Sequence, residues 1–348
     1  MTYFALWAKA PDKALEVARE VDAASPNNLE ALAALGRVSL AVGNQKLAQS
    51  VFGRMARLAG FDPAWQTQIA RYQAAAGNAQ GAAYSLEKAL SGRPDYLPAQ
   101  VLLAELDLRS GDAAKAEQRA KAIVSRSPDK ALGYRLLGDV SMARKSYPEA
   151  IERYRTALSK EPGTEGALLV FSANVQAGNI KAGNEFLETW LRAHPGDALA
   201  RRALAEGYVR AGNLAAARSR YEQILKEQGD DAPLLNNLAN ILLLQGDRKA
   251  LEYAERAYQL APNDASIQDT LGWALVEQGQ MDQGLRHLRD ARLRDPGNAE
   301  IRYHLATALF RAGRKEEARR ELEPVLKEDV RFASRDSARA LWRNLSAD

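Results

Sequence analysis

Apolar and small residues recur along this chain at the spacing of one face of an α-helix. Residues 131–162 show the pattern most clearly. A first stripe, at positions i, i+3, i+4 and i+7, consists of Tyr134, Leu137, Gly138 and Ser141. After a break, a second stripe consists of Ala150, Tyr154, Ala157 and Leu158. Because about 3.6 residues complete a helical turn, each stripe lies on one side of a helix, and the segment is predicted to form two amphipathic helices.

The same unit repeats along the whole chain, marked by a small residue every 33 or 34 positions. These residues are Ala14, Ala48, Ala82, Ala116, Ala150, Gly183, Ala217, Ala250, Gly284 and Ala318. Five positions earlier (four before Ala250) most units have a glycine, namely Gly43, Gly77, Gly111, Gly178, Gly212, Gly246, Gly279 and Gly313. Twelve positions later most units have a proline, namely Pro26, Pro94, Pro128, Pro162, Pro195, Pro262 and Pro296. A fixed period of this length indicates a repeat architecture.

Each recurring residue has a place in a pair of helices. The glycine supplies the left-handed backbone that ends the first helix, and the proline stops the second helix where the next unit begins. Small residues in the first helices allow the paired helices to approach closely; they are Gly36, Ala70, Ala104, Gly138, Ala205, Ala239, Gly272 and Ala306. Because one pair buries too little apolar surface to fold alone, stacking of the pairs supplies the core.

This pattern resembles the tetratricopeptide repeat (TPR), whose consensus has an aromatic residue or Leu, then Leu-Gly and Tyr, then Ala, Phe and Pro. The best copies are Leu32, Leu35, Gly36, Ala48 and Phe52; Tyr134, Leu137, Gly138, Ala150, Tyr154 and Pro162; and Leu204, Ala205, Tyr208, Ala217 and Tyr221. The resemblance implies an all-α fold, a right-handed superhelical TPR solenoid of helix-turn-helix repeats with a C-terminal capping helix.

Three parts are expected: a truncated repeat at residues 1–28, nine TPR repeats at 29–330 and a capping helix at 331–348. The chain starts within a unit, since Ala14 already belongs to a second helix and residues 2–9, with Phe4 and Trp7, form only the remnant of a first helix. We therefore expect a fragment of a longer protein, with any signal peptide or lipid anchor upstream.

Some units depart from the pattern. Lys145 replaces the turn glycine of its unit, and the next unit is one residue short with Gly166 inside its first helix. Because a glycine within a helix costs about 0.5–1 kcal/mol relative to alanine, residues 163–183 are predicted to be the softest part of the array. Pro324 lies late in the last second helix, where it is predicted to kink or end that helix.

Residues 332–346 are predicted to form one amphipathic helix. Its apolar face consists of Ala338, Leu341, Trp342 and Leu345. On another face, arginine recurs every four residues at Arg331, Arg335, Arg339 and Arg343. This face is either the solvated back of a capping helix or a basic stripe for an acidic partner, a polysaccharide or membrane headgroups.

Composition excludes several classes of protein. The chain has no cysteine, which rules out disulfides and thiol catalysis and fits an oxidising compartment as well as the cytosol. No run of about 18 apolar residues is present, so no membrane-spanning helix is expected. The net charge of +4, from 48 basic and 44 acidic residues that alternate along the chain, is too small to predict nucleic-acid binding.

The chain also lacks recognisable catalytic chemistry. His194, His287 and His304 are isolated from one another and from any metal-ligand spacing, and His194 precedes a closing proline as a turn residue would. No phosphate-binding glycine loop, nucleophile elbow or kinase signature occurs. A protein that is not an enzyme, with no metal and no cofactor, is expected.

Resemblance to TPR arrays implies that the first helices line a concave groove that holds a protein or peptide. The groove-facing positions are expected beside the core stripe, four residues apart on one helix face. The predicted ligand-binding residues are Arg202, Glu206, Asn236, Asn240, Asp269, Trp273 and Tyr303, with Thr307 completing the last pair. Equivalent pairs upstream are Arg135 with Asp139 and Val101 with Glu105.

The side chains at these positions suit an extended partner. Asparagine offers a donor and an acceptor to peptide backbone, and Trp or Tyr offers a flat anchor for a protein or a sugar ring. The alternative is a groove that is merely hydrated. A carboxylate clamp like that of chaperone-binding TPR proteins needs lysine, and this stripe has arginine and asparagine instead.

Several short segments resemble one bacterial family as a set. They are Leu234–Asn240, Ala250–Ala257, Asp269–Trp273, Tyr303–Ala306 and Ala338–Trp342. They are similar to the C-terminal half of the TPR lipoproteins of the exosortase/PEP-CTERM system (PrsT-like), which are associated with exopolysaccharide production. This resemblance implies a scaffold in the bacterial cell envelope, facing the periplasm. A cytosolic peptide-binding adaptor or co-chaperone and a regulatory TPR module of a larger enzyme are the alternatives.

Overall fold

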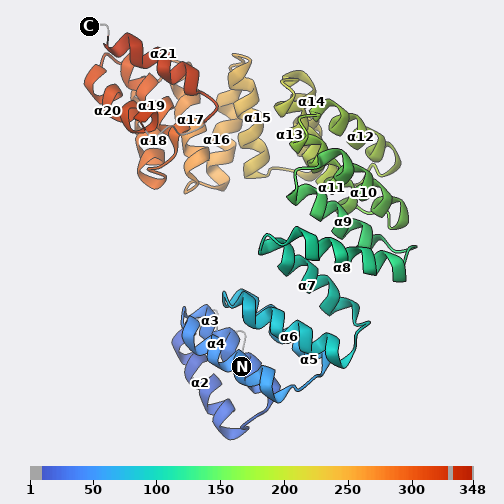
Figure 1. Ribbon diagram of the computed structural model, residues 1–348. Helices are drawn as coiled ribbons and strands as arrows, with labels where there is room; N and C mark the ends of the chain where they lie inside the picture. The colour runs from blue at the N-terminus through green and yellow to red at the C-terminus, as the bar shows by residue number, and fades with distance from the viewer. Residues whose placement is uncertain (1–9, 328–331, 347–348) are drawn as a thin grey trace. The chain divides into compact units, whose positions relative to one another are not determined.

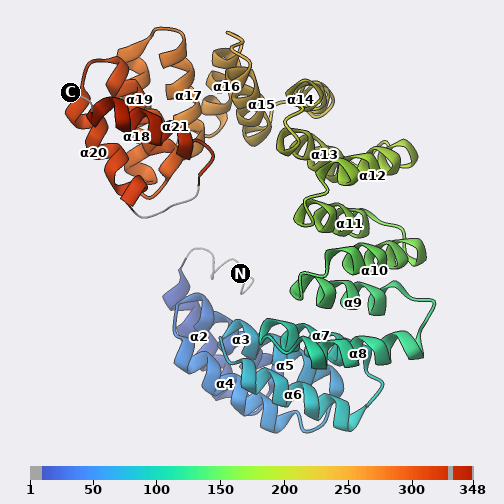
Figure 2. The ribbon, with the colours of Figure 1, turned by 45° about the horizontal axis from the view of Figure 1, so that its top comes forward.

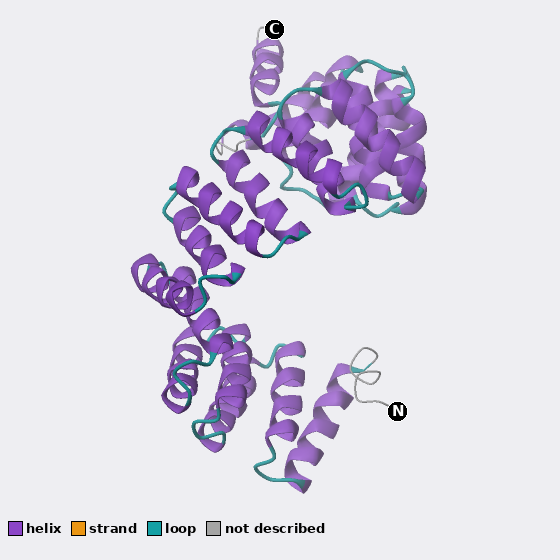
Figure 3. Cartoon of the chain, turned by 90° about the vertical axis from the view of Figure 1, so that its right-hand side faces the viewer, coloured by secondary structure: helices purple, strands orange, loops and turns teal. Residues whose placement is uncertain are grey.

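The chain is a succession of short helices. The computed structural model describes residues 10–327 and 332–346, and these residues form twenty α-helices and no strand (Figures 1 and 3). The chain divides into two compact units, Met1–Ala177 and Gly178–Asp348. The prediction of an all-α array of helix pairs is confirmed for the described residues.

The helices of both units have similar lengths. The first unit contains α2 (Pro11–Ala24), α3 (Leu29–Ala41), α4 (Gln45–Leu58), α5 (Pro63–Ala75), α6 (Ala79–Gly92), α7 (Leu97–Arg109), α8 (Ala113–Arg126), α9 (Ala131–Ala143), α10 (Tyr147–Lys160) and α11 (Thr164–Gln176). The second unit contains α12 (Ile180–Ala193), α13 (Ala198–Arg210), α14 (Leu214–Gln228), α15 (Ala232–Leu244), α16 (Ala250–Leu260), α17 (Ala265–Glu277), α18 (Met281–Arg294), α19 (Ala299–Arg311), α20 (Lys315–Lys327) and α21 (Arg335–Ser346).

Consecutive helices within a unit pack against one another. In the first unit α3 contacts α4, α5 contacts α6 and α7 contacts α8, and Figure 2 shows these pairs stacked side by side. Many of the helices begin after an asparagine or aspartate whose side chain accepts a hydrogen bond from a backbone N–H of the first turn, as Asn44 does from Leu47 at 3.1 Å. Such a cap satisfies a donor that the helix itself leaves unpaired.

The recurring small residues lie where they were predicted, at the contact between the two helices of each pair. Ala48, Ala82, Ala116 and Ala150 are fully buried, and so is Ala318 in the last pair. The first helix of each of two pairs also packs closely on its partner. A Cβ added at Gly36 would overlap the ring of Phe52, and one added at Gly138 would overlap the ring of Tyr154. The period of the chain is therefore the period of its closest helix contacts.

The recurring glycines end the first helices in a left-handed conformation, with φ between 67° and 85°. Lys145 occupies the equivalent turn and adopts a φ of 58°. A side chain at this backbone conformation is strained by about 1–2 kcal/mol, which glycine avoids because it has no Cβ. The turn of this repeat therefore keeps its geometry without its glycine.

The C-terminal end differs from the sequence prediction at the start of its last helix. Pro324 lies inside α20, close to its last residue Lys327, and Leu322 and Val325 on either side of the proline are buried. The last helix, α21, begins at Arg335 rather than at 332. Its apolar face is confirmed, since Ala338, Leu341 and Leu345 are buried. Arg331 and the predicted helix remnant at residues 2–9 lie outside the described residues.

Candidate partner-binding surface

The first helices of the second unit place their polar side chains on one shared surface. Helix α15 contacts α17, and α17 contacts α19. We call the following residues the first-helix surface: Glu206 and Arg210 of α13, Asn237, Asn240 and Leu244 of α15, Trp273 and Glu277 of α17, and His304, Thr307 and Arg311 of α19. They recur at the repeat period, so each helix contributes the side chains of the same face.

One part of this surface is a depression of about 370 Å³ between α13 and α15. Its lining consists of Glu206, Val209, Arg210, Tyr221, Asn237, Asn240, Ile241 and Leu244. Leu244 is 71% exposed and Val209 is 36% exposed, although both are apolar. The depression therefore presents aliphatic surface to solvent beside two carboxamides.

Polar groups at the edge of the depression keep free capacity for hydrogen bonds. The Asn237 Nδ2 lies 3.4 Å from the hydroxyl of the buried Tyr221 and donates to it. Burial and the nearby Glu206 carboxylate raise the pKa of Tyr221 to about 12, so that its hydroxyl is neutral at physiological pH. Glu206 and Arg210 form no ion pair with any other described residue.

The surface becomes a connected set of side chains between α15 and α19. The Thr270 hydroxyl lies 3.3 Å from Asn240 Oδ1, which links α17 to α15. The indole of Trp273 stacks on the His304 ring with centroids 5.0 Å apart, and the Arg311 guanidinium lies 4.9 Å from the same indole. Arg311 also pairs with Glu277 at 2.6 Å. These contacts hold α17 and α19 together.

The structure places the predicted ligand-binding residues at different depths. Glu206, Asn240 and Trp273 are on the first-helix surface, and Thr307 lies in register with them. Asn236 and Asp269 are not, because they are only 8% and 7% exposed. On α15 the side chain at the surface is Asn237, one residue after Asn236. On α17 Thr270 is buried as well, at 3% exposed, so Trp273 and Glu277 present this face.

Asn237 lines the depression although it is not among the predicted ligand-binding residues. Its signal was present, since Asn237, Asn240, Ile241 and Leu244 fall at i, i+3, i+4 and i+7. Trp273 also differs from expectation, because His304 and Arg311 cover part of its ring and leave less of it as a flat anchor. The part played by any of these residues in binding stays a prediction.

The other predicted residues have internal partners. Arg202 pairs with Asp231 at 3.3 Å, and Tyr303 packs against the apolar cluster of α19, α20 and α21. In the first unit Arg135 pairs with Glu165 at 2.8 Å. Val101 and Glu105 line a second depression, of about 460 Å³.

Asp139 accepts a 2.7 Å hydrogen bond from the Tyr154 hydroxyl. Burial raises the pKa of Asp139, against the lowering effect of that hydrogen bond and of Arg135. This predicted pair in the first unit is therefore engaged mainly within the protein.

Each of the three histidines contacts an aromatic side chain. His194 stacks on Trp190 at 3.8 Å, and His287 meets the edge of Tyr258 at 5.2 Å. In the described part of the chain no three His, Cys, Asp or Glu side chains are grouped so as to hold a metal ion. Within residues 10–327 and 332–346, no helix has the length and apolar character needed to cross a bilayer.

Comparisons with known proteins agree with this architecture. One tetratricopeptide repeat family model matches residues 73–140 and 275–341, and a second tetratricopeptide repeat model matches residues 202–265. The TPR repeat-containing protein PA4667 of Pseudomonas aeruginosa is 28% identical over 174 residues, which are 48% of this chain. The chain spans only 29% of the length of that relative.

A solved structure shares the fold at low sequence identity. The chain is similar to one in the crystal structure of the APC/C hetero-tetramer Cut9-Hcn1, with 15% identity, a TM-score of 0.52 and coverage of 99% of this chain and 82% of that one. A tetratricopeptide repeat protein from Parabacteroides merdae ATCC 43184 is also 15% identical, with a TM-score of 0.49 over 71% of this chain and 99% of that one.

Proposed function

The chain belongs to the tetratricopeptide repeat proteins, and from that premise we propose that it is a non-catalytic scaffold whose first-helix surface in the second unit holds an extended segment of a partner protein. Repeat arrays of this kind present continuous surfaces for protein–protein interaction, because equivalent positions of stacked repeats are neighbours.

The depression between α13 and α15 is the observation that supports this proposal. An extended peptide exposes a backbone donor and acceptor at nearly every residue, and its side chains alternate between two sides. Asn237 and Asn240 offer carboxamides to such a backbone. Val209, Ile241 and Leu244 offer an aliphatic surface to one side chain. Glu206 and Arg210, which have no ion-pair partner among the described residues, offer charges to its neighbours.

A selected peptide tests the proposal. A short peptide is selected on the wild-type chain from a random library, and its Kd is measured by calorimetry against Asn240→Ala with Leu244→Ala. If Asn240 and Leu244 include a hot spot of the interface, truncation costs about 2 kcal/mol or more, so we expect the Kd to rise at least about thirtyfold. Neither side chain belongs to the buried core, so the melting temperature should change little.

The matched control is Leu260→Ala, which removes a leucine that is 53% exposed at the end of the second helix α16. Its Kd should equal that of the wild type. A comparison variant, Arg339→Ala with Arg343→Ala, removes two exposed charges of α21. If the peptide binds the Asn240/Leu244 variant normally and is lost from the arginine variant, the site is on the capping helix and the proposal is wrong.

We further propose a setting for this scaffold, the bacterial cell envelope, where it would organise exopolysaccharide assembly or export, or PEP-CTERM protein sorting. The support is the sequence resemblance at Asn236–Ala239 and Asp269–Trp273. Fractionation of cells that make the full-length protein tests this setting. Recovery with the envelope is the expected result. Recovery in the cytosol would favour a cytosolic adaptor instead, and a catalytic domain in the full-length protein would favour a regulatory TPR module.

A polysaccharide is an alternative ligand for the same surface. Trp273 and Tyr303 were predicted as flat anchors, but Trp273 is partly covered by His304 and Arg311, and Tyr303 packs against the core. The available aromatic surface therefore favours a peptide. Binding of purified exopolysaccharide in place of the selected peptide would reverse this assignment.

A further inference from the structure

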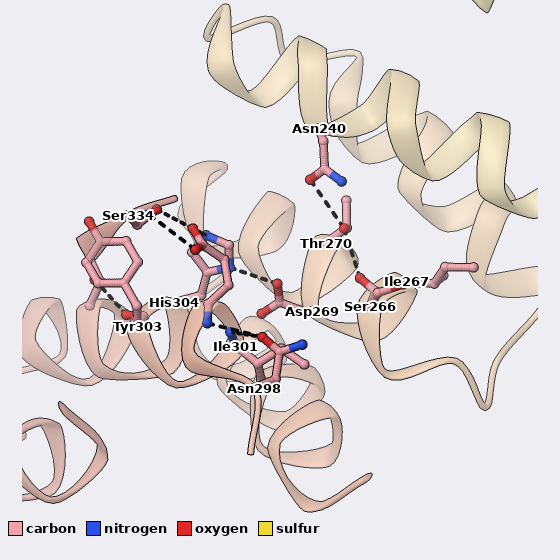
Figure 4. Close-up of polar contacts among 12 residues, drawn as sticks. Asn240, Ser266, Ile267, Asp269, Thr270, Asn298, Ile301, Tyr303, His304 and Ser334 are labelled. Atoms are coloured by element: carbon pink, nitrogen blue, oxygen red, sulfur yellow. Dashed lines mark hydrogen bonds and ion pairs between the residues drawn. The ribbon is translucent and has the colours of Figure 1, made fainter. Parts of the chain in front are cut away.

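His304 of α19 contacts Asp269 of α17 directly and is linked through Glu300 to Ser334, the residue before α21. Its ring extends from α19 towards α17, where its Nδ1 lies 2.8 Å from Oδ2 of Asp269 (Figure 4). Its Nε2 lies 4.0 Å from Oε1 of Glu300, one turn earlier on α19. The side chains of His304 and Asp269 are only 17% and 10% exposed, so water screens their interaction weakly.

Glu300 extends this chain of contacts to the last helix. Its carboxylate accepts a 3.2 Å hydrogen bond from the backbone N–H of Ser334 and a second one from the Ser334 hydroxyl. Ser334 directly precedes α21, whose Leu341 and Leu345 are buried in the same cluster as α19 and α20. One carboxylate thus contacts both the segment that leads into α21 and the histidine.

The two protonation states of His304 differ in how they meet these carboxylates. A neutral imidazole has one donor and one acceptor, so that if Nδ1 donates to Asp269, the lone pair of Nε2 faces the Glu300 carboxylate. A protonated imidazole has two donors, one for each carboxylate. Only the charged ring is complementary to both neighbours.

The charged groups around His304 favour its protonated form. Asp269 and Glu277 face the ring from α17, Glu300 faces it from α19, and the segment before α21 contributes the uncharged Ser334. Burial lowers the pKa of His304, but the charge and hydrogen bond of Asp269, with Glu300 and Glu277, raise it by more, so that it lies above the ordinary value. Arg311 is paired with Glu277, and its guanidinium lies 4.9 Å from the centre of the Trp273 indole, the ring that stacks on His304.

We propose that the protonation state of His304 controls how firmly α21 and the α17–α19 contact are held, with the charged ring giving the tighter state. A proton bound more tightly by the folded chain than by the unfolded chain stabilises the fold. This contribution is complete below the unfolded pKa of about 6.5 and is lost as the pH rises through the higher pKa of the folded chain. It needs no bound partner and does not depend on the proposed function.

Two measurements on the full chain test this effect of His304 protonation. NMR titration of the three histidines should give His304 a higher midpoint than His287, whose pKa burial lowers. Hydrogen exchange of residues 335–346, corrected for the intrinsic effect of pH, should accelerate as the pH rises from about 6.5 through the His304 midpoint that the NMR titration gives. The total acceleration should approach about tenfold for each pH unit by which the His304 midpoint exceeds the value of a free histidine.

The variants separate this effect from general packing. His304→Gln should remove the pH dependence of exchange in residues 335–346, whereas the control His287→Gln, on α18, should keep it. Glu300→Gln preserves an acceptor for Ser334 and removes a charge, so it should lower the His304 midpoint in a folded chain. A His304 midpoint at or below that of a free histidine, or unchanged pH dependence in His304→Gln, would overturn the proposal.

Discussion

Gly133 and Gly166 occupy the third position of two consecutive first helices, α9 and α11, but their surroundings differ. A Cβ at Gly133 would stand 2.9 Å from the backbone nitrogen of Val124, which cannot move without its helix. A Cβ at Gly166 would meet Cδ1 of Leu158 at 3.0 Å, the end of a flexible side chain. Gly166 also borders a depression of about 200 Å³. The first glycine is required by packing and the second is not.

Alanine at these two positions is therefore expected to have opposite effects. Gly166→Ala should raise the free energy of unfolding by about 0.5–1 kcal/mol, because alanine restricts the unfolded chain and fits the helix. Gly133→Ala should lower it by about 1–3 kcal/mol through overpacking. Urea denaturation of both variants beside the wild type measures the difference. Equal effects of the same sign would show that the two sites are not distinguished by packing.

At the scale of helices, the array depends on the close contact between the two members of each pair. Ala150 of α10 is fully buried, whereas its neighbour Glu149 is exposed. The paired helix α9 places Gly138 against Tyr154 of α10. Little space is therefore left for a larger side chain on this face of α10.

We expect Ala150→Trp to lower the free energy of unfolding by at least about 1–3 kcal/mol, since an indole cannot enter this contact without separating the helices. Glu149→Trp is the matched control and should be nearly neutral, because its side chain points to solvent. Thermal unfolding followed by circular dichroism measures both. A melting temperature of Ala150→Trp equal to that of the control would mean that the assigned pairing register is wrong.

The helices and their pairing could be predicted from the sequence because small residues, turn glycines and prolines recur in phase. The candidate surface was predicted less well for a geometric reason. Adjacent residues of a helix point about 100° apart, so an error of one position moves Asn236 into the core and leaves Asn237 on the surface. The pairing of His304 with Asp269 joins residues 35 positions apart, and no periodic pattern marks which side chains meet across repeats.

At the scale of the whole chain, the irregular repeat coincides with the division between the two compact units. The first unit ends at Ala177 and the second begins at Gly178, within the residues 163–183 that were predicted to be soft. Among these residues are Gly166 in α11 and Gly183 in α12. Each unit has its own buried clusters, so each has a source of stability that does not depend on this segment.

Hydrogen exchange in the native chain should therefore be fastest, among helical segments, in residues 163–183. Gly166→Ala should slow exchange there without changing exchange in residues 45–58 of α4, which serve as the internal reference. Protection of residues 163–183 equal to that of α10 and α13 would show that the array absorbs its shortened repeat without local weakening.

The most direct test of the proposed scaffold function is photo-crosslinking in cells that make the full-length protein. A photo-reactive amino acid is placed at Leu244, on the first-helix surface, and in a second strain at Leu260, on a second helix. We expect position 244 to give a discrete crosslinked product with a partner protein and position 260 to give none. Crosslinks from Leu260 alone, or equal products from both positions, would contradict binding at the first-helix surface.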